Sequence, residues 1–253
     1  MRPVTLYFHG LPGSAAELLN FGPEIAAQVG HFHVVDRSAA PGEGYFSQLA
    51  ARIAATFPDE PLRLVGFSLG AAAALQVAPH LGASVERIDL VSPAAPLQLG
   101  DFLPGMAGAP VFRAALSGRM PFAALTFMQA QVARIAPAKM AEALMAKASG
   151  ADRALAGDPQ FIAGLAQSLR QSLLAQRAAY TAEIRAYVAD WTRVLVEVHQ
   201  PVTIWQGSED DWTPPAMAEA LAAQLPGAPA MQMQPGFSHF STLRAYLAAE
   251  PRP

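Results

Sequence analysis

Residues 66–70 read Gly-Phe-Ser-Leu-Gly, which places a serine between two glycines at the end of an apolar run. The run 62–65 predicts a strand, and the alanine-rich run 71–77 predicts a helix. A serine on so tight a strand-to-helix turn is typical of a nucleophile elbow, because flanking small residues let the two backbones come close together. Such a hydroxyl attacks an acyl carbon once a neighbouring base removes its proton. We therefore predict that Ser68 is a nucleophile; a serine that only caps the helix is the alternative.

A second motif follows the first apolar run of the chain, where residues 9–14 read His-Gly-Leu-Pro-Gly-Ser. A glycine-rich turn at the end of a strand leaves backbone N–H groups free to bind a developing oxyanion. Acyl transfer needs two such donors, and we expect the N–H groups of Leu11 and Leu69 to form this oxyanion hole. We expect His9 to brace the loop through hydrogen bonds rather than to act in catalysis.

The elements that must position these motifs alternate along the chain. Short apolar runs bounded by Gly, Pro or Asp predict six strands, over residues 4–9, 32–36, 62–66, 87–91, 202–205 and 229–233. Helical patterns lie between the early strands, over residues 14–29, 45–57 and 68–80. The first helix would start with a capping box of Ser14 and Glu17, and Thr213 would cap a later helix. This alternation predicts an α/β fold with a doubly wound, mostly parallel sheet and helices on both faces.

Residues 94–193 interrupt the alternation of strands and helices. This stretch is rich in Ala, Leu, Met, Arg and Gln with helical spacing, and it contains no convincing strand. We expect a helical cap inserted into a core that is formed by residues 1–93 and 194–253. The cap would lie over the serine with an apolar underside, because pockets favour the junctions between such units. The candidates for the substrate pocket are Phe67 and Leu11.

The composition excludes several other classes of function. The 253 residues include no cysteine, which excludes disulfides, thiolate metal sites and a cysteine nucleophile. A formal net charge of −3 gives no strong attraction to nucleic acid. The sequence has no apolar run of about 18 residues and no signal-peptide cleavage site near its start, so we expect no membrane span. We therefore expect a cytoplasmic protein that binds a small-molecule substrate and holds no metal.

The two glycine-containing motifs and the later helical insertion together resemble the α/β-hydrolase fold superfamily, and within it the serine hydrolases and esterases that carry a helical cap. The resemblance covers nearly the whole chain. It departs from the family at the N-terminus, where the usual antiparallel strands are missing because the His-Gly motif begins at residue 9. The resemblance therefore implies a sheet of about six strands.

The resemblance also implies an acid and a base for the serine. In the family the acid follows a strand in a Gly-x-x-Asp-x-x-x-Pro pattern, and Gly207, Asp210 and Pro214 match it. The family histidine lies in a glycine-rich loop after the last strand, which here contains His239. These residues complete a catalytic triad in the family's chain order of serine, acid and histidine. Asp211 is a competitor for the role of the acid.

These residues predict a serine hydrolase that cleaves a carboxylic ester, or a related acyl bond, of a small and largely apolar substrate through an acyl-enzyme, without a cofactor. Thioesters and lactones are further options for the bond. One alternative is hydrolysis of a carbon–carbon bond in a diketone-type substrate, since family members of that kind also have a serine triad and a helical cap. The other is a ligand-binding α/β-hydrolase-like protein without catalysis.

Overall fold

The apolar runs form one sheet of six parallel strands in the computed structural model, which describes residues 2–39 and 42–250. The strands pair in the order β2-β1-β3-β4-β5-β6. Their bounds are β1 (Val4–Phe8), β2 (His33–Val34), β3 (Leu62–Phe67), β4 (Val85–Val91), β5 (Val202–Gly207) and β6 (Ala230–Gln234). The predicted parallel sheet of about six strands is thereby confirmed, and β2 is shorter than expected.

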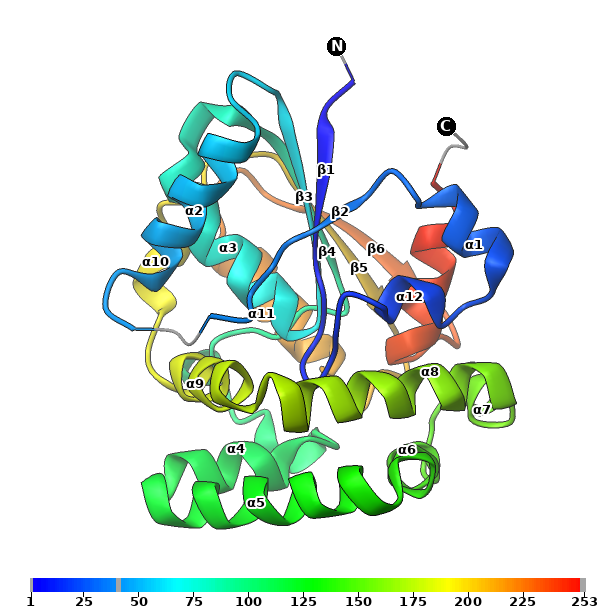
Figure 1. Cartoon of the computed structure of the whole chain (residues 1–253). Coiled ribbons are helices and arrows are strands. Elements are labelled where there is room, and N and C mark those ends of the chain that lie inside the picture. The colour runs from blue at the N-terminus through cyan, green and yellow to red at the C-terminus, as the bar shows by residue number, and fades with distance from the viewer. Residues whose placement is uncertain (1, 40–41, 251–253) are drawn as a thin grey trace.

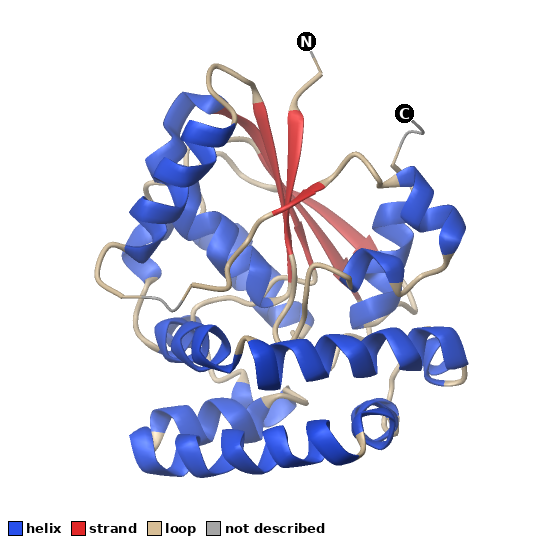
Figure 2. Ribbon diagram, viewed as in Figure 1, coloured by secondary structure: helices blue, strands red, loops and turns tan. Residues whose placement is uncertain are grey.

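Helices cover both faces of this sheet and also its carboxyl edge (Figures 1 and 2). Those on the first face are α2 (Tyr45–Thr56), α3 (Leu69–Leu81) and α11 (Pro215–Gln224), and those on the second are α1 (Pro23–Gln28) and α12 (His239–Ala248). The helices between β4 and β5 are α4 (Ala109–Leu116), α5 (Arg119–Ile135), α6 (Pro137–Met145), α7 (Asp152–Ala156), α8 (Pro159–Arg170), α9 (Arg177–Val188) and α10 (Thr192–Leu195).

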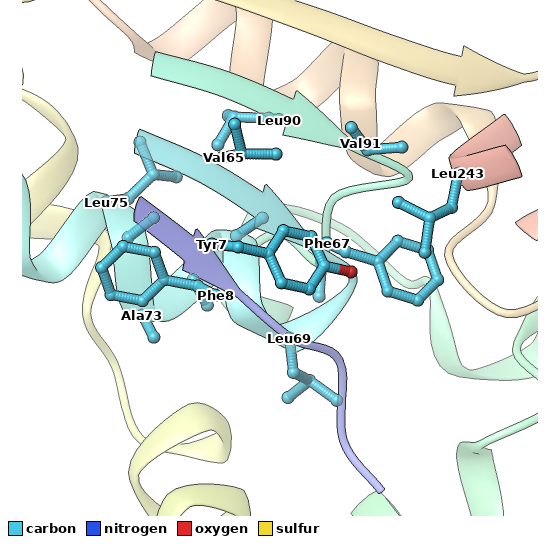
Figure 3. Packing of buried hydrophobic residues seen from close by; sticks show 14 of the residues in the cluster. Tyr7, Phe8, Val65, Phe67, Leu69, Ala73, Leu75, Leu90, Val91 and Leu243 are labelled. Carbon is cyan, nitrogen blue, oxygen red and sulfur yellow. The ribbon is translucent and has the colours of Figure 1, made fainter. Parts of the chain in front are cut away.

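The centre of the sheet is packed on both faces because its strands are largely apolar. All six residues of β3 are buried. Alternation along β1 sends Tyr7 to one face and Phe8 to the other. Figure 3 shows Tyr7 beside Phe67 on the face of Leu243 in α12, whereas Phe8 lies beside Leu75 of α3. The strand ends that carry the two glycine-containing motifs are therefore anchored from both sides.

The single helix expected over residues 14–29 is wrong. A short 3-10 turn covers Glu17–Leu19, and α1 starts only at Pro23. Proline is favoured in the first turn of a helix because it has no N–H to leave unpaired, so it starts a new helix instead of continuing an old one. The expected capping box also fails, because the Glu17 carboxylate turns inward and binds Tyr7 instead.

Helices α4 to α9 lie across the carboxyl ends of the strands, whereas α10 packs beside α3 on one face of the sheet (Figure 1). Helices α8 and α9 are next to the sheet, while α4, α5 and α6 form a second layer farther away. A π-helical turn, Gln171–Ala175, joins α8 to α9. Phe122 of α5 is completely buried and lies under the Arg185 guanidinium of α9, 5.7 Å from the guanidinium carbon to the ring centroid, so it contacts the inner layer. Phe161 of α8 is also completely buried and packs against Phe240 of α12, with 5.3 Å between ring centroids.

The far end of α12 is attached to the amino half of the sheet by a buried guanidinium. Arg63 of β3 donates to Asp89 Oδ2 (2.6 Å) and to Glu250 Oε2 (2.7 Å). A buried charge is tolerated only when it is paired in this way. Because α12 begins with His239, this cluster fixes the helix that carries the predicted base.

Candidate active site

The serine motif forms the expected sharp turn between β3 and α3. Ser68 has φ = 55° and ψ = −125°, a conformation that is strained for a residue with a side chain. A Cβ atom on Gly66 would lie 2.6 Å from the Ala71 Cα, and one on Gly70 would lie 2.0 Å from the Phe8 carbonyl oxygen. Only glycine fits at these two positions, so the local sequence and the packing against β1 together hold Ser68 in this conformation.

Asp210 and His239, distant in sequence, form a buried pair. Asp210 Oδ2 lies 3.0 Å from His239 Nδ1, and both side chains are almost fully buried. The other carboxylate oxygen accepts the N–H groups of Trp212 and Thr213, each at 2.9 Å. These backbone donors fix the carboxylate, which in turn fixes the imidazole.

The two members of this pair shift each other's pKa in opposite directions. Burial by itself would raise the pKa of Asp210, but the charge of His239 and hydrogen bonds from His239 and Thr213 hold it below its ordinary value. Burial by itself would lower the pKa of His239, but the charge and hydrogen bond of Asp210 raise it above its ordinary value, helped by Asp152 and Glu17. The pair therefore favours an ionised carboxylate and stabilises an imidazolium.

Asp211, the competing acid, lies beside this pair without joining it. Its backbone carbonyl accepts the N–H of Ala107, at 2.7 Å. Its Oδ1 atom is buried and has no hydrogen-bond partner among the described residues. Burial, and then the nearby charge of Asp210, raise the pKa of the Asp211 carboxyl.

Thr213 and Trp212 surround the histidine, although the sequence had suggested another role for Thr213. The expectation that Thr213 caps a helix is wrong, because α11 starts at Pro215 and Pro214 occupies the capping position. The Thr213 hydroxyl instead lies 3.1 Å from Asp210 Oδ2 and 3.2 Å from His239 Nδ1. The Trp212 ring stacks on the imidazole with 5.7 Å between centroids.

The loop after β1 presents the other predicted donors to the same site. Leu11, Leu69 and Ser68 line one cavity, and neither leucine N–H has a hydrogen-bond partner among the described residues. The conformation of this loop is set by Glu17, whose Oε2 atom accepts the Tyr7 hydroxyl (2.6 Å) and the Gly10 N–H (3.0 Å). Burial raises the pKa of Glu17, a carboxyl that also lines the small cavity beside Ser68.

A buried arginine braces the same loop from the other side. Arg37 Nη2 donates to the carbonyl oxygen of His9 and lies 3.2 Å from His9 Nδ1. Arg37 Nη1 pairs with Glu183 of α9 at 2.6 Å, so the loop is tied to the inserted helices. Burial, reinforced by the charge of Arg37, lowers the pKa of His9 to about 3. His9 is therefore neutral and hydrogen-bonded inside the loop.

The segment between α6 and α7 joins the loop of the acid to the loop of the base. The Ser149 hydroxyl donates to the carbonyl oxygen of Glu209 (2.6 Å) and lies 2.9 Å from Ser238 Oγ. The Ala151 N–H donates to the carbonyl oxygen of Gly236 (2.9 Å). One short stretch of the insertion thus holds both loops in register.

Asp152 completes this connection at the start of α12. Its buried carboxylate accepts the N–H groups of Phe240 (3.0 Å) and Ser241 (2.6 Å), the two residues after His239. The first turn of a helix has unpaired N–H groups and a positive partial charge, both of which a carboxylate satisfies. A side chain from the insertion therefore fixes the backbone that carries the imidazole.

A cavity of about 190 Å³ lies between these loops and the inserted helices. From the core it is lined by Leu11, Pro12, Ser68, Leu69, Trp212 and Thr213. The insertion contributes mainly apolar side chains, including Met106, Phe112, Met140, Leu144, Leu169, Leu173 and Ile184. A second space of about 20 Å³ is lined by Ser68, His239 and Phe67, so the two predicted pocket residues, Leu11 and Phe67, line adjoining spaces at the serine.

Several residues around the site carry no recognisable signal in the sequence. The capping-box pattern conceals the inward position of Glu17, and Arg37 follows a strand in a position typical of a solvated charge. Asp152 could have been noticed only as an acid at the start of a short helix. The partners of Arg37 and Asp152 lie far away in the chain, and the inward turn of Glu17 towards Tyr7 follows no local pattern.

Residues 2–39 and 42–250, which the structure describes, contain neither a metal-binding cluster nor a membrane-spanning helix. No cluster of three or more His, Cys, Asp or Glu side chains there could hold a metal ion. No helix in those ranges is long and apolar enough to cross a membrane.

Comparisons with known proteins identify the family and the fold. A family model described as the alpha/beta hydrolase family matches residues 6–244. A thermophilic esterase from Thermogutta terrifontis superposes with a TM-score of 0.67 and 17% identity, over 99% of this chain and 87% of that chain. The enol-lactonase from Burkholderia xenovorans LB400 superposes with a TM-score of 0.64 and 17% identity, over 98% of this chain and 88% of that chain.

A third solved structure, bromoperoxidase from Bacillus anthracis, superposes with a TM-score of 0.59 and 17% identity, over 98% of this chain and 88% of that chain. At such identities these structures show the shared fold alone. No curated protein matches the sequence. The family model spans the sheet, the insertion and every predicted site residue, and the chain is therefore a member of the alpha/beta hydrolase family.

Proposed function

We propose that this member of the family is a serine hydrolase that cleaves a carboxylic ester, or a related acyl bond, of a small and largely apolar substrate through an acyl-enzyme. One observation carries the proposal: Ser68 occupies a strained turn at a cavity next to a buried histidine, and that histidine is paired with an ionised carboxylate at 3.0 Å. Such a pair stabilises the imidazolium that forms when the histidine takes a proton from the serine.

In the first half-reaction, Ser68 Oγ attacks the carbonyl carbon while His239 Nε2 takes the hydroxyl proton. The carbonyl oxygen gains the negative charge and accepts hydrogen bonds from the N–H groups of Leu11 and Leu69. The bond to the alcohol then breaks, and the imidazolium returns its proton to the departing oxygen. Asp210 keeps its charge throughout and holds the imidazole in the required tautomer.

In the second half-reaction, a water molecule gives its proton to His239 and attacks the acyl carbon. The bond to Ser68 Oγ breaks, the serine regains a proton, and the carboxylic acid leaves. The inserted residues 94–193 act as a cap over this chemistry. Their apolar side chains around the cavity keep bulk water away, which strengthens the hydrogen bonds to the oxyanion.

The proposal is tested with a fluorophosphonate probe and a panel of p-nitrophenyl esters of graded acyl length. Labelling should occur on Ser68, and both labelling and turnover should be absent in a folded Ser68→Ala variant. Labelling without turnover of any ester, thioester or lactone, combined with cleavage of a diketone, would move the reaction to carbon–carbon bond hydrolysis. Neither labelling nor turnover would indicate a binding protein. Two structural neighbours are an esterase and an enol-lactonase, so the panel includes both open and cyclic esters.

A further inference from the structure

The cavity above Ser68 is apolar except at a few positions. On the core side its polar side chains are Ser68 itself and Thr213, which is already engaged with the acid and base. On the side of the inserted helices two further polar side chains line it, Gln129 of α5 and Tyr180 of α9. Neither has been given a role in the hydrolytic reaction.

Tyr180 is buried, with 2% of its surface exposed, and its hydroxyl makes no hydrogen bond to any described residue. The other buried tyrosines behave differently, since Tyr187 donates to the Ala95 carbonyl oxygen at 2.8 Å and Tyr7 donates to Glu17 at 2.6 Å. Buried hydroxyls usually find such a partner. The Tyr180 hydroxyl is thus available to a molecule in the cavity.

Gln129 provides a second polar side chain in the wall of the same cavity. Its Oε1 atom is fully enclosed and has no hydrogen-bond partner among the described residues. Gln129 belongs to α5 in the outer layer of the insertion, whereas Ser68 is at the end of β3, so the cavity reaches from the serine to the second layer of helices. A buried carbonyl without a partner costs free energy, which a hydrogen-bond donor on a ligand would recover.

The absence of charged side chains from the cavity wall restricts which ligands can bind there. None of the described residues that line the cavity carries a charged side chain. A carboxylate or ammonium group placed there would lack a counter-ion, and burial of an unpaired charge is very costly. The polar group that fits is therefore uncharged and able both to donate and to accept a hydrogen bond.

We propose, on the basis of the proposed function, that the substrate carries a hydroxyl or another uncharged donor–acceptor group at the end remote from the scissile bond. The Tyr180 hydroxyl and the Gln129 amide would bind this group. The apolar side chains that line the rest of the cavity, such as Leu173 and Ile184, would contact the hydrocarbon part of the substrate. Gln129 and Tyr180 are then specificity-determining residues, and a plain alkyl ester is the poorer substrate.

The test uses two matched pairs of synthetic esters, so that either side of the scissile bond can occupy the cavity. One pair compares alkanoyl esters with ω-hydroxyalkanoyl esters of the same length, and the other places the hydroxyl on the alcohol. For at least one pair at some chain length, kcat/KM should favour the hydroxy ester by about tenfold or more. Gln129→Leu and Tyr180→Phe should each reduce this preference ratio towards one, chiefly through KM.

Gln131→Leu provides a matched control, since Gln131 is on the same helix as Gln129 and does not line the cavity. It should leave the preference ratio as in the wild type. Equal rates for hydroxy and alkyl esters at every length, or equal losses on both members of a pair in the two cavity variants, would overturn the proposal. Failure of the proposed function itself is distinguishable, because no ester of either pair would then be turned over at any chain length, with or without labelling of Ser68.

Discussion

The cavity has a floor and a roof that are built by different interactions. The floor consists of the loops 9–13, 66–70, 207–213 and 235–240, and the roof consists of helices α4 to α9. In the floor, backbone N–H groups, carboxylates and close glycine contacts hold each reacting side chain, as with the 2.9 Å hydrogen bonds to Asp210. In the roof, hydrophobic packing predominates.

The outer face of the roof illustrates this difference. Met120, Phe127 and Ile135 of α5 are 81%, 53% and 80% exposed, so a long helix of the roof is buried on one side only. Fewer buried contacts give a region a lower free energy of local opening. We therefore expect the floor to determine the chemistry and the roof to determine which substrates reach it.

Side chains of the roof also contact the floor at two places. Asp152 of α7 holds the start of the helix that carries His239, and Glu183 of α9 pairs with Arg37 beneath the loop of Leu11. Substitutions in the floor should lower the catalytic rate more than substitutions of Asp152 and Glu183, the two residues of the roof that contact the floor.

The largest effect should come from the nucleophile. Ser68→Ala should lower kcat by roughly 10³-fold or more, because the residues of a triad act as a unit. The variant should fold normally, since serine and alanine differ by one oxygen atom. Circular dichroism together with steady-state kinetics on the best ester checks this. Turnover close to that of the wild type in a folded variant would remove Ser68 from the mechanism.

The second effect separates two neighbouring carboxylates of the floor. Asp210→Asn should lower kcat/KM by about 10²-fold or more relative to Asp211→Asn, because only Asp210 contacts the imidazole. Asp211→Asn serves as the matched control, since it removes a charge one residue away. Comparable losses in the two variants would mean that the hydrogen bond at 3.0 Å does not orient the base.

The third effect tests whether the roof reaches the floor through Asp152. Asp152→Asn should lower kcat/KM by about tenfold near neutral pH, because one strong acceptor for the first turn of α12 becomes weaker. Its pH profile should also move. The base acts when neutral, so activity falls as the pH drops below the raised pKa of His239. Loss of the Asp152 charge lowers that pKa and shifts the acid limb to lower pH.

Asp158→Asn is the control for this variant. Asp158 also accepts N–H groups at a helix start within the roof, at 2.9 Å from the Gln160 nitrogen, and it makes no contact with His239. The acid limb of the pH–activity profile of Asp158→Asn should coincide with that of the wild type. An unshifted acid limb in Asp152→Asn would show that the carboxylate has only a structural role.

The smallest effect on rate should come from the second anchor of the roof. Glu183→Gln leaves the buried Arg37 charge without its counter-ion, which should cost about 3 kcal/mol in the free energy of unfolding. Glu183 touches no reacting group, so kcat should change by less than about threefold. Urea unfolding and kinetics at a temperature where the variant is folded give both values. A large loss of rate with little loss of stability would assign Glu183 to the reaction.

Local patterns in the sequence determined the framework and the serine. Unbroken apolar runs predict parallel strands because both faces of such a sheet are covered, and glycines around Ser68 predict a turn that no larger residue fits. The acid and the base followed from a resemblance, in which the family's Gly-x-x-Asp-x-x-x-Pro spacing favours Asp210 over Asp211. The boundaries of the cap, the catalytic roles of Ser68, Asp210 and His239, and the assignment of Leu11 and Phe67 to the substrate pocket stay predictions.

Tertiary structure decided what depended on distant partners. Glu17 looked like half of a capping box, yet it binds Tyr7 in the core because the strand end beside it offers a buried hydroxyl and an N–H. Thr213 looked like a helix cap, yet it points at Asp210 and His239. Hydrogen-bonding side chains pair with whichever groups the fold brings near, so their partners are not predicted by local patterns. Apolar periodicity and the glycines of a tight turn are visible in a few consecutive residues, so the elements they form can be predicted from the sequence alone.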